Sequence, residues 1–267
     1  MAKVNSKKNI VKKKNNIPTT LQDQLIADSG LGTTDFGSAD LALPYISILQ
    51  ANSPQCVRSS PGYIEGAQEG MFYNTVGGDT YDGDEGILIV PCGYQKKFVE
   101  WVPRDSGGGW VGAYGLNDPY ALAVVKADLR DERGKLITVN DNHFVDTGYH
   151  FYLYFDGDKW QQGLSGLTST QLKQSRRWNS NIVDAYESIN GDRIRLPMFG
   201  QQYKATTAVE TKDSNSWMGW RFSFVGAVTD SEVYTSAKAF YHIVDSGNAN
   251  IGPPPSETNG NTTASVI

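Results

Sequence analysis

Hydrophobic and polar residues alternate with a period of two over most of the middle of the chain. The run GILIVPCGYQKKFVEWVPR (86–104) follows the turn cluster GGDTYDGDEG and predicts a long strand. The runs ALAVVKADL (121–129) and KLITV (135–139) flank DERG and predict a second hairpin. GYHFYLYFDGDKWQQGL predicts two strands around the tight turn at Asp156-Gly157-Asp158. The pattern therefore indicates a strand-rich domain built from neighbouring hairpins.

After Leu167 the period becomes that of a helix, in STQLKQSRRWNSNIVDAYESI, where Thr168 or Ser169 can cap the start. The residues that share one helical face are Leu172, Ser175, Asn179, Ile182, Val183 and Tyr186. Strands return with QQYKATTAVET and SWMGWRFSFVGAV, which are joined by the turn KDSN. A closing helix is predicted in TDSEVYTSAKAFYHIVDSG, from the capping box Thr229…Glu232 to Gly247.

This order of elements is compatible with a five-stranded Greek-key barrel of the OB type, in which a helix lies between the third and fourth strands. A β-sandwich or jelly roll usually lacks a central amphipathic helix. We therefore predict a mainly β fold of the α+β class: an OB-like barrel with an inserted helix and a C-terminal helix. The predicted domain covers residues 39–246. Residues 1–38 and 247–267 are polar and rich in Gly, Asn, Pro or Thr, which predicts a disordered basic arm and a disordered tail.

Charge is distributed unevenly along the 267 residues. The first 20 residues hold six lysines and no acid, so the total of −5 leaves −11 on the remainder. Such an arm can contact phosphates or act as a solubilising tail. No apolar run approaches the roughly 18 residues of a membrane helix, so we expect no membrane partner. Two cysteines, Cys56 and Cys92, are too few for a disulfide scaffold and indicate reduced thiols.

Signals for catalysis are weak. The three histidines are widely separated and no phosphate-binding GxxxxGK[ST] loop is present. The acidic cluster at residues 79–85 can ligate a divalent cation, but Gly-Asp alternation is more typical of a turn. We therefore predict no enzymatic activity, no catalytic or metal-binding residue and no cofactor. A metal-dependent nuclease is the weaker alternative.

Signals for binding are stronger. Strand alternation places His150, Tyr152 and Tyr154 on one face, which predicts an aromatic row on which unpaired bases stack. In 94–102 the same alternation separates Tyr94 and Lys96 from Lys97 and Trp101, and does not show which face is exposed.

The helical stretch LKQSRRWN adds a cluster of cations, and residues 168–204 carry a net charge of +3 within an otherwise acidic body. For any one of these cations a solvated helix face is the simpler explanation. Together with the aromatic strands they favour a groove for single-stranded nucleic acid. The candidate DNA contacts are Tyr94, Lys96, Lys97, Trp101, Arg104, Tyr152, Tyr154, Lys173, Arg176, Arg177 and Trp178.

The sequence also resembles a known group of proteins in ADLALPYISILQANSPQ (39–55), in residues 70–112, in LKQSRRWN and in MFGQQYKATTAVETKDSNSWMGWRFS. These motifs are similar to a family of bacteriophage proteins that includes single-stranded DNA-binding proteins of OB fold. The resemblance implies a non-enzymatic protein that coats unwound DNA during phage replication or recombination, in the cytoplasm of the infected bacterium. It implies DNA contacts by Tyr94, Lys96, Lys97, Trp101, Lys173, Arg176 and Arg177.

One departure from that family concerns the tail. Many single-strand binders end in an acidic tail that recruits replication proteins, whereas only Glu257 is acidic after Gly247. The pattern is compatible with phage replication proteins as partners and with a homo-oligomer. The apolar motif ALPYISILQ predicts a packing segment or a subunit contact. A virion or assembly protein is the main alternative function, because phage structural proteins are also β-rich with polar ends.

Overall fold

The computed structural model describes residues 18–29, 31–32, 42–212, 214–249 and 251–252. The chain divides into two units, Met1–Asp40 and Leu41–Ile267. Helix α1 (Thr19–Ala27) belongs to the first unit and buries none of its residues. It forms inside the stretch 1–38 for which the sequence predicts disorder, because TTLQDQLIA follows Pro18 and consists largely of good helix formers. The lysines of the predicted basic arm lie outside the described residues.

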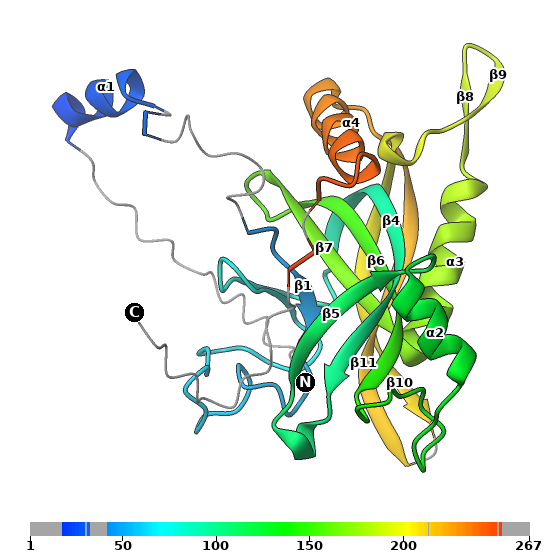
Figure 1. The fold of residues 1–267 in the computed structure, drawn as a ribbon. Coiled ribbons are helices and arrows are strands. Elements are labelled where there is room, and N and C mark those ends of the chain that lie inside the picture. The colour runs from blue at the N-terminus through cyan, green and yellow to red at the C-terminus, as the bar shows by residue number, and fades with distance from the viewer. Residues whose placement is uncertain (1–17, 30, 33–41, 213, 250, 253–267) are drawn as a thin grey trace, which may run out of the picture. The chain divides into compact units, whose positions relative to one another are not determined.

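The second unit is organised around an antiparallel sheet, which has six strands in the described part of the chain (Figure 1). These strands are β4 (Ile87–Val102), β5 (Gly109–Gly115), β6 (His143–Phe155), β7 (Trp160–Thr168), β10 (Gln201–Lys212) and β11 (Asn215–Ala227). Their order is β11-β10-β4-β6-β7, and β5 pairs with the second half of β4. The smaller strands are β1 (Ile46–Ile48), β2 (Phe72–Asn74), β3 (Thr80–Tyr81), β8 (Tyr186–Ile189) and β9 (Asp192–Arg195).

This sheet is open, so the predicted closed OB-like barrel is wrong. The edge strands β7 and β11 do not pair with each other within the described residues. Both edges instead contact the segment that begins at Pro44. The Leu164 amide of β7 donates to the Pro44 carbonyl. The Gln50 side chain forms hydrogen bonds with both the amide and the carbonyl of Met218 in β11. These contacts satisfy backbone groups that would otherwise be left at the sheet edges.

The same contacts explain the apolar motif ALPYISILQ. Tyr45, Ile46 and Leu49 are buried within the unit, and β1 pairs with β2 to form a small sheet with β3. Of the two alternatives for this motif, the packing segment is therefore confirmed.

Helices cover both faces of the main sheet. They are α2 (Pro119–Ala127), α3 (Leu172–Val183) and α4 (Ser231–Asp245), with short 3-10 turns η1 (Arg104–Ser106), η2 (Ser169–Gln171) and η3 (Met198–Gly200). Phe151 of β6 packs with α4, whereas its neighbour Tyr152 points to the opposite face and packs with Trp178 of α3. Phe144, on the same face as Tyr152, packs with α2. Helices α2 and α3 thus lie on one side of the sheet and α4 on the other (Figure 1).

The predicted hairpins β6–β7 and β10–β11 are confirmed, and so is the helix α3 as far as Val183. Tyr186–Ile189, which the sequence places in the same helical stretch, instead form β8. The predicted strand 121–129 is wrong, because these residues form most of α2. The Asp118 carboxylate accepts hydrogen bonds from the amides of Tyr120 and Ala121, and Pro119 occupies the first turn. Ala121 and Val124 then bury one helical face.

The end of the described chain is more ordered than predicted. Asp230, rather than Thr229, caps the start of α4, and Gly247 has a φ of 78° just beyond its end, as the sequence predicts. Ile251 is buried in the cluster that contains α4, and the Tyr45 hydroxyl donates to the Gly252 carbonyl at 3.0 Å. The predicted disorder of 247–267 is therefore wrong for residues 247–249 and 251–252, and residues 250 and 253–267 lie outside the described residues.

Candidate functional site

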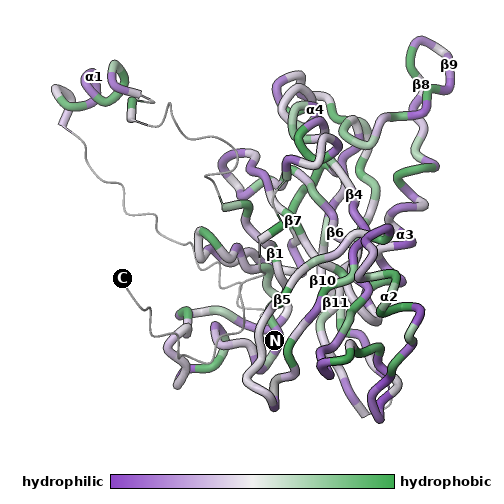
Figure 2. The backbone as a smooth tube through the Cα atoms, in the orientation of Figure 1, coloured by the Kyte–Doolittle hydropathy of each residue, from purple (hydrophilic) through white to green (hydrophobic). Residues whose placement is uncertain are grey.

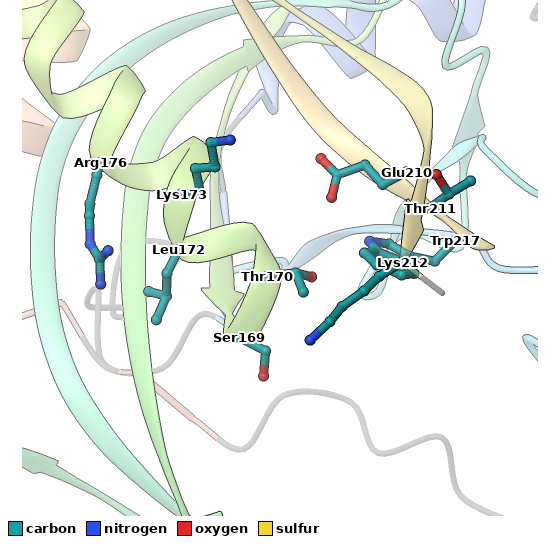
Figure 3. A pocket seen from close by; sticks show the side chains of 9 residues that line it. All are labelled: Ser169, Thr170, Leu172, Lys173, Arg176, Glu210, Thr211, Lys212 and Trp217. Carbon is teal, nitrogen blue, oxygen red and sulfur yellow. The ribbon is translucent and has the colours of Figure 1, made fainter. Parts of the chain in front are cut away.

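The tip of the hairpin β10–β11 faces η2 and the start of α3 across two adjoining cavities of about 420 and 480 Å³. Four residues line both cavities: Ser169, Thr170, Lys212 and Trp217. Figure 3 shows the Lys212 side chain extending from the hairpin toward η2, with Trp217 beside it. We call these two cavities the hairpin pocket.

Local structure fixes both walls of the hairpin pocket. The chain leaves β7 through Ser169, whose φ of 49° lies in the left-handed region that few non-glycine residues adopt. Gln171 then links the walls: its side-chain amide donates to Glu210 at 3.0 Å and its oxygen accepts from the Trp220 amide at 3.0 Å. The start of α3 is thereby held against β10 and β11.

The pocket is cationic. Lys173, Arg176 and Lys212 line it, are exposed, and form no ion pair with any other described residue. The acid among the described lining residues is Glu210, which is bound to Arg221 at 2.6 Å between Nη1 and Oε1. No side chain caps η2 or α3 at Thr168 or Gln171, so the positive end of the helix dipole adds to the same field.

Trp217 gives the pocket an aromatic surface. Its ring is half-buried and lines both cavities, next to the cation of Lys212. Its indole Nε1 is buried and has no hydrogen-bond acceptor among the described residues. A flat ring beside cations can hold a planar, negatively charged ligand.

Comparison with known proteins gives a family. A model described as Pam3 phage gp34-like protein matches residues 11–250. The chain belongs to the Pam3 phage gp34-like family. Neither the curated proteins nor the solved structures contain a match.

Membership of the gp34-like family confirms the phage part of the resemblance found in the sequence. The description of the family names no single-stranded DNA-binding protein. Within the described residues of this gp34-like chain, no helix is long and apolar enough to cross a membrane.

Of the predicted DNA contacts, Lys173 and Arg176 lie in the hairpin pocket. Arg177 is exposed on α3 but does not line the pocket. Lys212 and Trp217 were missed by sequence reasoning. Lys212 is the first residue of the turn KDSN and Trp217 lies two residues after it, which places both near a hairpin tip but does not show what that tip faces.

The predicted aromatic row on β6 is wrong, because α3 covers His150 and Tyr152 and the small sheet β1–β3 covers Tyr154. Tyr152 and Tyr154 are fully buried, and their hydroxyls bond to Ser165 and Asn74 at 2.5 and 2.8 Å. Burial raises the pKa of Tyr152 well above its usual range. His150 bonds to Ser175 of α3 at 2.7 Å, and burial lowers its pKa to about 3.

Trp178 is likewise a core residue rather than a DNA contact. Its side chain is 1% exposed and stacks on Phe222, with ring centroids 3.9 Å apart and planes inclined by 10°. The ring of His150 stacks on Trp178 at 4.6 Å. A base cannot reach this ring without displacing α3.

The predicted contacts on β4 do not form one surface. Tyr94 is 37% exposed and packs on His150, on the face that carries α3, and Lys96 on the same face pairs with Asp146 at 3.0 Å. Lys97 points to the opposite face, where Trp101 packs half-buried against the cluster around α4. Arg104 begins η1, and its side chain lies outside the described residues.

The acidic turn at residues 79–85 is accounted for structurally. The Asp82 carboxylate accepts from the amides of Asp84 and Glu85 at 2.8 Å. Gly83 lies so close to the Gly70 carbonyl that a Cβ would overlap it. Among the residues that the structure describes, no three His, Cys, Asp or Glu side chains are grouped as metal ligands. The turn therefore gives no support to the nuclease alternative.

Proposed function

We propose that this phage protein binds single-stranded DNA, without sequence preference, in the hairpin pocket. One observation carries the proposal: Lys173, Arg176 and Lys212 line a single pocket with Trp217, and the acid beside them is neutralised by Arg221. Proteins that bind single strands combine cations that hold the backbone with aromatic rings on which bases stack.

The chemistry of the pocket matches the chemistry of that ligand. The three cations offer charge-assisted hydrogen bonds to phosphate oxygens, and Arg176 can bind two oxygens at once. Trp217 offers a ring whose stacking energy with a base is about 1 to 3 kcal/mol. Stacking on an indole and contacts to phosphate are independent of base identity, which is why we infer binding without sequence preference.

Salt dependence tests the proposal quantitatively. Each phosphate that a protein neutralises on a single strand contributes about −0.7 to the slope of log affinity against log salt concentration, so three contacts give a slope of about −2. The measurement is fluorescence anisotropy of a labelled oligo-thymidine over a range of salt concentrations. A duplex of equal length is the control, because its bases are not available to Trp217.

Tight binding of the single strand, weak binding of the duplex and a slope of about −2 or steeper support the proposal. Absence of binding at low salt, or equal binding of the duplex, contradicts it. In that case the alternative of a virion or assembly protein becomes the better explanation, and self-assembly of the purified protein without nucleic acid is the property to measure.

A further inference from the structure

The hairpin β8–β9 is a ribbon of two strands that pair only with each other in the described part of the chain. It follows α3 directly and projects from the sheet (Figure 1). The Leu196 amide donates to the Ala185 carbonyl at 3.0 Å, and both side chains are buried at the base of the ribbon. Beyond this base, seven of the eight strand residues are exposed and Glu187 is half-buried.

The two faces of this ribbon differ sharply in charge. The register pairs Tyr186 with Arg195 and Ser188 with Arg193, so these four residues share one face. The other face holds Glu187, Ile189, Asp192 and Ile194. Both cations of the ribbon thus lie on one face and both acids on the other. We call the first face the arginine face.

Three features of the arginine face are typical of a surface that contacts nucleic acid. Arg193 lies over the ring of Tyr186, 4.2 Å from its centroid. Neither Arg193 nor Arg195 forms an ion pair with another described residue. The face has no aliphatic side chain, unlike the opposite face with Ile189 and Ile194. Guanidinium groups bind phosphate with two parallel hydrogen bonds, and a Tyr ring can stack on a base.

We propose that the arginine face is a second contact for the same strand that occupies the hairpin pocket. This inference rests on the proposed function. Helix α3 connects the two sites, with its first turns at the pocket and its last residue three positions before the ribbon. Its 12 residues span about 18 Å at 1.5 Å per residue. Helix α3 is hydrophilic along most of this length (Figure 2), and Arg177 is exposed on it.

Strand length then decides which contacts form. With phosphates about 3.4 Å apart in a stacked strand and roughly twice that in an extended one, the length of α3 corresponds to about three to five nucleotides. An oligo-thymidine of two residues can occupy the pocket but cannot also reach the ribbon. One of about 16 residues, the upper end of known site sizes for a single domain, can engage both.

The experiment compares the affinities of these two oligonucleotides for the full chain and for the double variant Arg193→Ala, Arg195→Ala. We expect the variant to lose about tenfold or more in affinity for the long strand and about 1.4 in salt slope, with no change for the short strand. The matched control is Ile189→Ser with Ile194→Ser on the opposite face, which is expected to change neither affinity. The charge-preserving variant Arg193→Lys, Arg195→Lys is expected to retain the salt slope.

The outcomes separate the two proposals. If the unaltered protein binds neither oligonucleotide, the proposed function is wrong. If it binds both and the arginine variant keeps full affinity for the long strand, only the inference about the ribbon is wrong. A loss of self-association in sedimentation, without any change in the affinity for the long strand, would identify the arginine face as a protein contact and also contradict the inference.

Discussion

Arg221 Nη1 of β11 lies 2.6 Å from Glu210 Oε1 of the neighbouring strand β10. The side chains of Gln171 and Gln174 also donate to Glu210, at 3.0 and 3.4 Å. The Glu210 carboxylate therefore binds one cation and two side-chain amides. The positive field of the hairpin pocket depends on this arrangement, because Glu210 is the acid among the described residues that line it.

Replacing Arg221 by Gln should expose the pocket to the charge of Glu210. At about 8 Å and an effective dielectric constant near 20, the unfavourable interaction with a bound phosphate is about 2 kcal/mol, which lowers affinity for an oligo-thymidine about thirtyfold. The reciprocal change Glu210→Gln should raise affinity by a similar factor. The affinities of both variants are measured by anisotropy at low salt. If the two affinities change in the same direction, Glu210 does not control the field of the pocket.

Each pocket cation should contribute separately to salt dependence. Lys173→Ala, Arg176→Ala and Lys212→Ala are each expected to weaken binding and to reduce the magnitude of the salt slope by about 0.7. The matched control is Lys238→Ala on α4, an exposed lysine on the opposite face of the sheet. If the control lowers the slope as much as the pocket variants do, binding is diffuse and the pocket is not the site.

Trp178 and Trp217 should respond to substitution in opposite ways. Because Trp178 is stacked within the core, Trp178→Ala should lower the free energy of unfolding by about 3 to 5 kcal/mol. Trp217→Ala should cost far less stability, because the ring is half-exposed, and should weaken binding instead. Urea denaturation followed by circular dichroism measures the first effect. A stable, fully folded Trp178→Ala protein with impaired binding would reverse our assignment.

His150 should make stability depend on pH below neutrality. Its pKa is near 3 in the folded protein and about 6.5 in the unfolded chain, so the unfolded chain binds the proton first as pH falls. The free energy of unfolding is therefore unaffected above pH 6.5 and decreases between pH 6.5 and 3, by at most about 1.4 kcal/mol per pH unit from this residue. His150→Gln should flatten the dependence between pH 6.5 and 5, where carboxylates titrate little. An unchanged slope would show that His150 is not the responsible group.

Local signals in the sequence were sufficient for several elements. The turn at residues 156–158 predicts the hairpin β6–β7, the residues that share a helical face predict α3, and the helix start near Thr229 with Gly247 at the end predicts α4. Helix α2 was misassigned although its signal was present: Asp118 followed by Pro119 is a helix start, but AVV within the run favours a strand. That the sheet stays open could not be predicted from the sequence. Its edges are covered by Gln50 and the Pro44 carbonyl, which come from an irregular segment.

The candidate site was predictable only in part, for a physical reason. Alternation along β6 separates two faces but is identical whichever face is buried, so the row at Tyr152 and Tyr154 could be taken for a stacking surface. Packing of α3 on Tyr152 and of the small sheet β1–β3 on Tyr154 determines that this face is buried. Lys173 and Arg176 were found because helix spacing is local, whereas Lys212 and Trp217 meet them only through tertiary contacts.

The most direct test of the central claim is tryptophan fluorescence during titration with oligo-thymidine at low salt, for the unaltered protein, Trp217→Phe and Trp101→Phe. Six tryptophans emit, and Trp217 is the one that lines the hairpin pocket. We predict quenching in the unaltered protein and in Trp101→Phe, and its loss in Trp217→Phe. Quenching that persists without Trp217 and disappears without Trp101 would contradict the account and place the strand elsewhere.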